Sequence, residues 1–171
     1  MTVSETSKIK SQLVIPELIK VNTSKNRPSL SIYFIVCDDD KFNGDSIKNC
    51  LTKMKFNNLD NVKIYTKVCT NGIDCLYEIY SDYKVGKKYS FLFIDENMPG
   101  INGSEVIKIL KTMIRNKFLN NIKICSITGF ENEDFEQNLK NIGCDIIIKK
   151  PVGNTKLEAI LKDIQISDLY L

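Results

Sequence analysis

Acidic, hydroxyl and amino side chains each directly follow an apolar run in this 171-residue chain. Asp38–Asp40 follow one run, and Asp95 follows another within Asp-Glu-Asn-Met-Pro-Gly. Thr128 and Lys150 follow two later runs. If these runs are parallel strands, the polar segments meet at the carboxyl edge of the sheet, where ligands bind in such folds. We therefore treat these residues as one candidate site.

Clustered carboxylates must either protonate in part or share a cation, because two like charges about 4 Å apart cost on the order of 4 kcal/mol at an effective dielectric near 20. Oxygen ligands with room for water suit Mg²⁺. Mg²⁺ beside an ammonium and a hydroxyl can hold phosphoryl oxygens, and a carboxylate can itself accept a phosphoryl group. The chain contains neither GxxxxGK[ST] nor GxGxxG, so we do not expect it to hold a nucleotide donor.

Each of these residues also has a structural interpretation when it is taken alone. Asp38–Asp40 could form the N-cap of the following helix, and Asp95 could start a turn. Thr128 could cap a helix near Glu131, and Lys150 could be a solvated lysine at a strand end. The site interpretation depends on all of them following strands at the same edge.

The composition excludes several kinds of chemistry. Histidine is absent, which excludes His-based catalytic triads, His metal ligands and a phosphohistidine on this chain. The cysteines form no CxxC pair and favour buried free thiols in a reducing compartment. We therefore expect an intracellular protein, cytoplasmic or nuclear. The six cysteines are Cys37, Cys50, Cys69, Cys75, Cys125 and Cys144.

Charge and hydropathy limit the partners further. The formal net charge of +3 falls within residues 1–30, so the rest of the chain is neutral and is not expected to bind nucleic acid. No apolar stretch reaches the length of a membrane span.

Apolar runs alternate with helical patterns from residue 31 onward. The run at 62–68 alternates apolar and polar residues, which predicts a strand at a sheet edge. Five strands, each followed by a helix with an apolar stripe, predict an α/β protein with a parallel sheet and helices on both faces. We place this domain at 31–166, between an extension at 1–30 and a tail at 167–171. The five predicted strands are 32–37, 62–68, 89–94, 122–127 and 146–148.

The motifs, taken in order, also resemble a known family. They are the aspartates after Cys37, the Asp-Glu-Asn-Met-Pro-Gly-Ile-Asn-Gly block from Asp95, the Ser-Ile-Thr-Gly segment from Ser126, and Lys-Lys-Pro from Lys149. This set resembles the receiver domain of two-component response regulators and hybrid sensor kinases. The resemblance implies a flavodoxin-like, doubly wound fold with strand order 2-1-3-4-5.

The resemblance also implies roles for the acidic residues. Asp95 would accept the phosphoryl group. Asp39 would bind Mg²⁺ directly, with Asp38 close by or acting through water. Asp95 and the backbone carbonyl of Asn97 would complete the protein ligands of Mg²⁺.

The remaining implied roles concern the switch and the partners. Thr128 would hydrogen-bond the phosphoryl oxygen, Lys150 would pair with the phosphoaspartate, and the Lys150–Pro151 peptide would be cis. A histidine kinase or histidine phosphotransfer protein would be the donor. A downstream protein would bind the face made by the fourth helix, the fifth strand and the fifth helix. Such a domain is not an enzyme beyond catalysing its own phosphorylation and dephosphorylation.

Two positions depart from the family pattern. Ile147 stands three residues before Lys150, where family members carry an aromatic switch residue, so we expect an altered activation step. Gly129 replaces the usual small side chain after Thr128, which we expect to loosen the start of the next helix.

Two other functions stay open at this point. An Mg²⁺-dependent phosphatase resembling the haloacid dehalogenases would use Asp38 and Asp40 as its D-x-D pair, with Thr128 and Lys150. A degenerate receiver would act only as a binding module.

Overall fold

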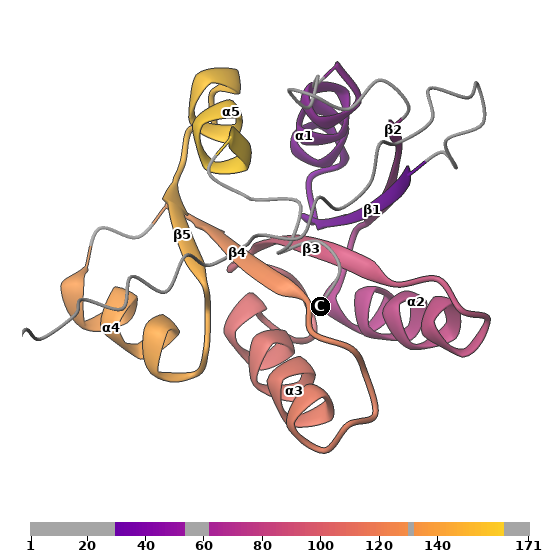
Figure 1. The fold of residues 1–171 in the computed structure, drawn as a ribbon. Coiled ribbons are helices and arrows are strands. Elements are labelled where there is room, and N and C mark those ends of the chain that lie inside the picture. Colours follow the sequence, from indigo (N-terminus) through magenta and orange to yellow (C-terminus); the bar gives the residue numbers. More distant parts are fainter. Residues whose placement is uncertain (1–29, 54–61, 130–131, 163–171) are drawn as a thin grey trace, which may run out of the picture.

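The computed structural model describes residues 30–53, 62–129 and 132–162, which form a parallel sheet between two layers of helices (Figure 1). This confirms the predicted α/β class. The strands are β1 Leu30–Cys37, β2 Val62–Cys69, β3 Tyr89–Asp95, β4 Lys123–Thr128 and β5 Ile146–Lys149. The helices are α1 Lys41–Lys53, α2 Gly72–Lys84, α3 Gly103–Arg115, α4 Glu133–Asn141 and α5 Asn154–Lys162.

The strand order is β2-β1-β3-β4-β5, as the resemblance implied. All neighbouring strands pair in parallel. In register, Cys37 lies opposite Ile94, and Asp95 lies opposite Ile127. Thr128 lies opposite Lys149. The carboxyl ends of β1, β3, β4 and β5 therefore form one continuous edge.

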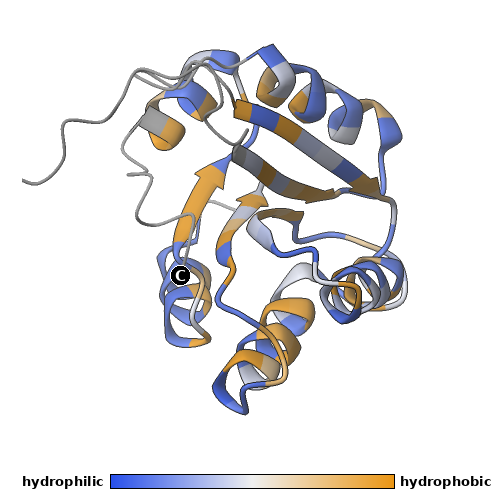
Figure 2. Ribbon diagram, turned by 45° about the vertical axis from the view of Figure 1, so that its right-hand side comes forward, coloured by the Kyte–Doolittle hydropathy of each residue, from blue (hydrophilic) through white to orange (hydrophobic). Residues whose placement is uncertain are grey.

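Two apolar layers hold the helices against the sheet. Helices α1 and α5 cover one face, and α2, α3 and α4 cover the other (Figure 1). On the first face, Phe91 and Phe93 of β3 stack with ring centroids 4.8 Å apart. On the second face, Leu92 and Ile94 of β3 belong to the other core cluster. Central strands buried on both faces explain the unbroken apolar runs in the sequence. In Figure 2 most strands are largely orange, whereas the helices carry both orange and blue residues.

Strand β2 is an edge strand, as its alternating sequence predicted. Its side chains alternate between half-buried and exposed along most of its length. The exposed Tyr65 stacks on Tyr33 of β1 with ring centroids 5.0 Å apart.

Polar caps set where several helices begin. Asn102 and Glu105 form a capping box at α3, and Asn71 accepts a hydrogen bond from the Asp74 N–H at the start of α2. All six cysteines are buried and free, as expected. Among the described residues, no helix is both long and apolar enough to cross a bilayer.

Some sequence predictions lie outside the described residues. They are the extension up to residue 29, the end of the domain at 163–166 and the tail at 167–171.

Candidate functional site

The polar residues singled out in the sequence gather at the carboxyl edge of the sheet. Asp95 is the last residue of β3 and Thr128 is the last residue of β4, so both belong to strands rather than to the loops after them. Asp38 directly follows β1, and Lys150 directly follows β5. Because β3 lies between β1 and β4, the strand order itself brings Asp38, Asp95 and Thr128 together.

The ammonium group of Lys150 joins two buried carboxylates. Its Nζ lies 2.9 Å from Asp95 Oδ1 and 3.3 Å from Asp38 Oδ2. The side chains of Asp95 and Asp38 are 5% and 2% exposed, whereas that of Lys150 is 32% exposed. Ion pairs with two nearly buried carboxylates are stronger than surface pairs, because the surrounding dielectric is low. Lys150 is therefore part of the site and not a solvated lysine at a strand end.

The electrostatics of this group favour a bound cation. Burial raises the pKa of Asp95, and the charge of Asp38 raises it further, against the opposing effect of Lys150. Burial alone would lower the pKa of Lys150, but its contacts with Asp95 and Asp38 outweigh burial and raise this pKa. Lys150 stays protonated, and one ammonium faces more than one carboxylate.

Asp38, Asp39 and Asp95 offer three carboxylate oxygens within 4.8 Å of one another. Asp39 is exposed and the other two are buried, so solvent reaches the cluster from the side of Asp39. An oxygen-only donor set with access for water fits Mg²⁺ better than the nitrogen- and sulfur-preferring metals. Asn97 is exposed in the loop after β3, and its carbonyl stays a predicted ligand.

The three consecutive aspartates divide the hydrogen bonds at the start of α1. Asp40 Oδ1 accepts the Phe42 N–H at 2.9 Å, so Asp40 caps the helix. Asp38 Oδ1 accepts the Asp40 N–H at 3.0 Å and the Asn43 amide at 3.3 Å. Asp38 Oδ2 meets Lys150. The capping interpretation thus holds for Asp40, while Asp38 both supports the turn and belongs to the site.

Thr128 is fully buried at the end of β4. Its backbone carbonyl accepts the Lys150 N–H at 2.8 Å, which ties the end of β4 to the residue after β5. The Lys150–Pro151 peptide is cis, as the resemblance implied. Asn132 caps α4 by accepting the Asp134 N–H. The alternative role of Thr128, as a helix cap near Glu131, concerns a position outside the described residues.

Glu96 is a buried carboxylate that the sequence analysis missed. Its Oε2 accepts the Ser104 N–H at 2.9 Å, and its carbonyl accepts the Gly103 N–H at 3.0 Å. Burial raises the pKa of Glu96, against its hydrogen bonds from Ser104. A Cβ on Gly103 would collide with the carbonyl oxygen of Asp95, so α3 packs directly on that strand end. An acidic residue beside Asp95, followed by Gly-Ser at a helix start, was the signal available in the sequence.

The two departures from the family pattern have simple surroundings. Ile147 is half-buried on β5 and packs against the core beneath α2, α3 and α4. An added Cβ on Gly129 would meet nothing within 4 Å. The expected change in activation stays a prediction.

Comparison with known proteins gives the family. Residues 34–162 match the family model of the response regulator receiver domain. The receiver domain of the Francisella response regulator 1452 is 22% identical with a TM-score of 0.58, over 76% of this chain and 93% of that chain. A CheY-like receiver domain from Methanospirillum hungatei is 21% identical with a TM-score of 0.60, over 79% and 93%. No curated protein matches the sequence significantly.

A third solved structure shows a related fold with ligands present. The CheX–CheY–BeF₃–Mg complex from Borrelia burgdorferi contains a chain 15% identical to this one, with a TM-score of 0.60, over 78% of this chain and 90% of that chain. At these identities the structures show the fold alone. The family match covers most of the sequence, so the chain belongs to the response regulator receiver domain family. It is a phosphoacceptor signalling domain and not an enzyme in the ordinary sense.

Proposed function

We propose that this chain takes a phosphoryl group from a phosphohistidine of a partner onto Asp95, in a reaction that requires Mg²⁺. The observation that carries this proposal is the bridge from Lys150 to Asp95 and Asp38 inside a three-carboxylate cluster. A buried carboxylate held by an ammonium beside further carboxylates has the positioning and charge that phosphoryl transfer needs.

The residues have separate tasks in this reaction. A carboxylate oxygen of Asp95 attacks phosphorus, a P–O bond forms, and the N–P bond to the donor imidazole breaks with its electron pair returning to nitrogen. Asp38, Asp39, Asp95 and the carbonyl of Asn97 would hold Mg²⁺. When bound, the metal would neutralise charge on the phosphoryl oxygens. Lys150 holds the Asp95 carboxylate and stays paired with the product.

Thr128 would couple phosphorylation of Asp95 to a change in the surface that a partner recognises. Its hydroxyl would donate a hydrogen bond to the phosphoryl oxygen, which would move the end of β4 and reshape the face of α4, β5 and α5. We propose that a downstream protein recognises this face. We propose a histidine kinase or histidine phosphotransfer protein as the donor, since this sequence contains no histidine that could carry the phosphoryl group. The buried free thiols fit a reducing compartment, which supports a place in the cytoplasm or nucleus.

Two contacts argue against the phosphatase alternative. Asp40, the second acid of the D-x-D pair, is exposed and bonded to the start of α1. Asp38 already binds Lys150, Asn43 and the Asp40 N–H. Both carboxylates thus hold the turn at the start of α1.

Incubation with acetyl phosphate and Mg²⁺, followed by intact-mass spectrometry, tests the proposal. We expect one phosphoryl adduct on the native chain, none on Asp95→Asn, and an unchanged adduct on the control Asp40→Asn. Turnover of p-nitrophenyl phosphate that is lost in Asp38→Asn but kept in Asp95→Asn would instead support the phosphatase. Absence of both an adduct and Mg²⁺ binding would indicate the degenerate receiver.

A further inference from the structure

A basic surface lies at the end of the domain opposite the acidic site. Two segments form it: residues 82–88 at the end of α2 and residues 115–123 at the end of α3. We call them together the basal surface. Asp82 is its one acidic residue, and its basic residues are Lys84, Lys87, Lys88, Arg115, Lys117 and Lys123. Strand β3 runs seven residues from Tyr89 at this end to Asp95, so the two ends are about 20 Å apart.

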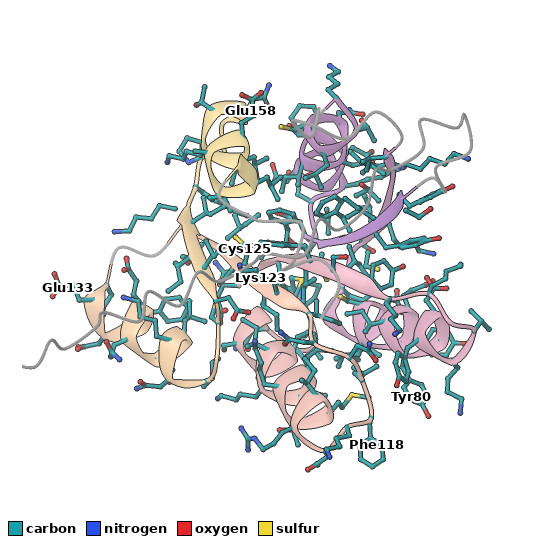
Figure 3. The ribbon with its side chains drawn as sticks, in the orientation of Figure 1. Tyr80, Phe118, Lys123, Cys125, Glu133 and Glu158 are labelled. Atoms are coloured by element: carbon teal, nitrogen blue, oxygen red, sulfur yellow. The ribbon has the colours of Figure 1, made fainter. Side chains whose placement is uncertain are left out.

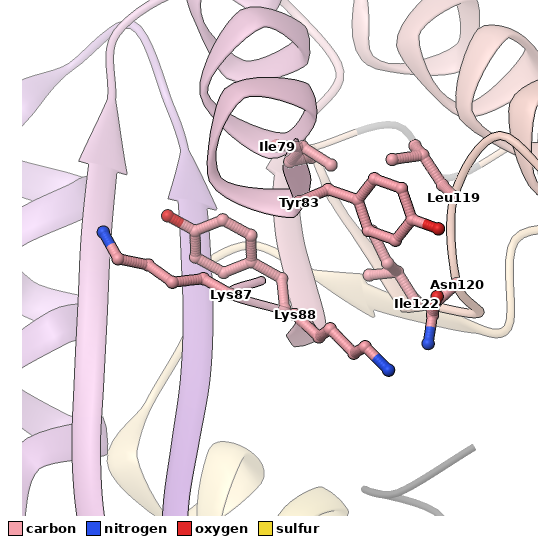
Figure 4. A pocket seen from close by; sticks show the side chains of 8 residues that line it. Ile79, Tyr83, Lys87, Lys88, Leu119, Asn120 and Ile122 are labelled. Carbon is pink, nitrogen blue, oxygen red and sulfur yellow. The ribbon is translucent and has the colours of Figure 1, made fainter. Parts of the chain in front are cut away.

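The two segments lie side by side. Tyr83 and Lys88 from the first and Leu119 and Asn120 from the second line one small hollow (Figure 4). The hollow holds about 10 Å³, which is room for about one water molecule. A peptide side chain cannot enter this hollow.

Large apolar side chains project from both segments. Val85 is 72% exposed and Phe118 is 61% exposed. Figure 3 shows Phe118 projecting from the end of α3 away from the sheet. Lys84 precedes Val85, and Lys117 precedes Phe118. An exposed apolar tip beside lysines on each of two adjacent turns is the pattern of a surface that enters a lipid interface.

Backbone hydrogen bonds hold both turns in place. Gly86, with φ +86°, donates to the Tyr83 carbonyl at 3.0 Å, and Lys117 donates to the Ile114 carbonyl at 2.9 Å. Lys117 has φ +62°, and no other described non-glycine residue has a positive φ. Glycine is favoured at such a position. A lysine at this position places a positive charge beside Phe118, although a positive φ is unfavourable for a residue with a side chain.

We propose that the basal surface binds an anionic lipid membrane surface, with Val85 and Phe118 entering the interface and the lysines pairing with lipid headgroups. The charge is complementary, because five of the six basic residues are exposed and the surface contains a single acidic residue, Asp82, which pairs with Lys87 at 3.0 Å. Exposed apolar tips beside lysines fit the interface of an anionic bilayer.

Two further observations fit this orientation. The acidic site would face away from the anionic surface, which avoids repulsion and leaves Asp95 accessible to a donor. The chain also enters the domain at the same end, because β1 is parallel to β3 and begins at Leu30. Residues 1–29 carry five basic and two acidic residues. Basic charge on the attached segment adds to attraction by an anionic surface.

Co-sedimentation of the full chain with lipid vesicles tests the proposal. The probes are phosphatidylcholine vesicles with and without roughly 30% phosphatidylserine. The test variant is the triple Lys84→Gln, Lys88→Gln, Lys117→Gly, which removes three charges and suits the positive φ of residue 117. The control triple, Lys41→Gln, Lys108→Gln, Lys156→Gln, removes the same charge from exposed residues outside the basal surface.

We expect the native chain to bind the anionic vesicles and not the neutral ones. Each removed basal charge should weaken partitioning about fivefold, so the test triple should weaken it about a hundredfold and the control triple less than threefold. Phe118→Ser should weaken it several-fold at unchanged net charge. Equal loss in both triples, or equal binding to neutral vesicles, would overturn the proposal. Binding to soluble polyglutamate that the test triple abolishes and Phe118→Ser leaves intact, without vesicle binding, would reassign the surface to an acidic protein.

Discussion

Replacing Lys150 by methionine tests whether the ammonium holds the acidic site together. Its contacts of 2.9 Å with Asp95 and 3.3 Å with Asp38 are each worth about 5–6 kcal/mol at an effective dielectric of about 20. Desolvation offsets much of this attraction, and removing one partner of a buried ion pair costs about 3–5 kcal/mol. Lys150 is about one third exposed, so we expect the free energy of unfolding to fall by about 3 kcal/mol.

Urea unfolding at neutral pH, without added metal, measures this effect. In a thermal scan, the same loss of about 3 kcal/mol would lower the melting temperature by about 6–12 °C. The matched control is the adjacent Lys149→Met, because Lys149 pairs with Glu136 at 3.1 Å while 48% exposed. We expect the control to lose less than about 1 kcal/mol.

Two further results distinguish this account from a general packing effect. In an Asp38→Asn background the cost of Lys150→Met should fall, because only one buried carboxylate is left without its partner. Mg²⁺ should restore more stability to Lys150→Met than to the native chain, because the metal supplies the missing charge. Equal losses for Lys150→Met and Lys149→Met would refute the reasoning.

Three more changes have defined outcomes. Thr128→Ala should still accept phosphate from acetyl phosphate within about threefold of the native rate, while the change in hydrogen exchange at α4 on phosphorylation is lost; retention of that change would contradict the switch role. Gly103→Ala should cost about 1–3 kcal/mol in urea unfolding, because the methyl group meets the carbonyl at the end of β3, whereas Gly129→Ala should be neutral or stabilise by up to about 1 kcal/mol. The hydrogen bond from the Tyr89 hydroxyl is the main reason that the pKa of Asp82 is lowered. The stability that Asp82 contributes is therefore present above pH of about 4 and lost as the pH falls below it. Tyr89→Phe should lower the free energy of unfolding by about 1 kcal/mol at pH 7 and should reduce the stability that is lost on acidification. If the difference in the free energy of unfolding between pH 7 and pH 3 were the same as in the native chain, this prediction would be wrong.

The sequence was most informative about the sheet. Unbroken apolar runs such as Phe91–Ile94 predict strands buried on both faces, and the alternation in Val62–Val68 predicts an edge strand; the structure confirms both. The order of the strands came from the resemblance, because periodicity identifies strands without saying which ones are neighbours. Exact ends were less accurate, since Asp95 and Thr128 belong to the strands that they were expected to follow.

The site was predictable to the extent that it depends on strand ends. Asp38, Asp95 and Lys150 converge because parallel strands end at one edge, and the sequence places a polar residue at each end. Glu96 could not be identified in the same way, because its role depends on the close approach of Gly103 to β3, which is a property of packing. Asp40 shows a second limit of the sequence. An aspartate can be either a favourable N-cap or a metal ligand, so residue type alone does not say which role Asp40 has.

The position of the phosphoryl group tests the central claim most directly. After reaction with acetyl phosphate and Mg²⁺, borohydride reduction would convert the phosphorylated aspartate to homoserine, and peptide mass spectrometry would locate it. The account predicts homoserine at position 95 alone, with none in Asp95→Asn and a strongly reduced yield in Asp39→Asn. Homoserine at position 38, or an adduct that persists in Asp95→Asn, would contradict it.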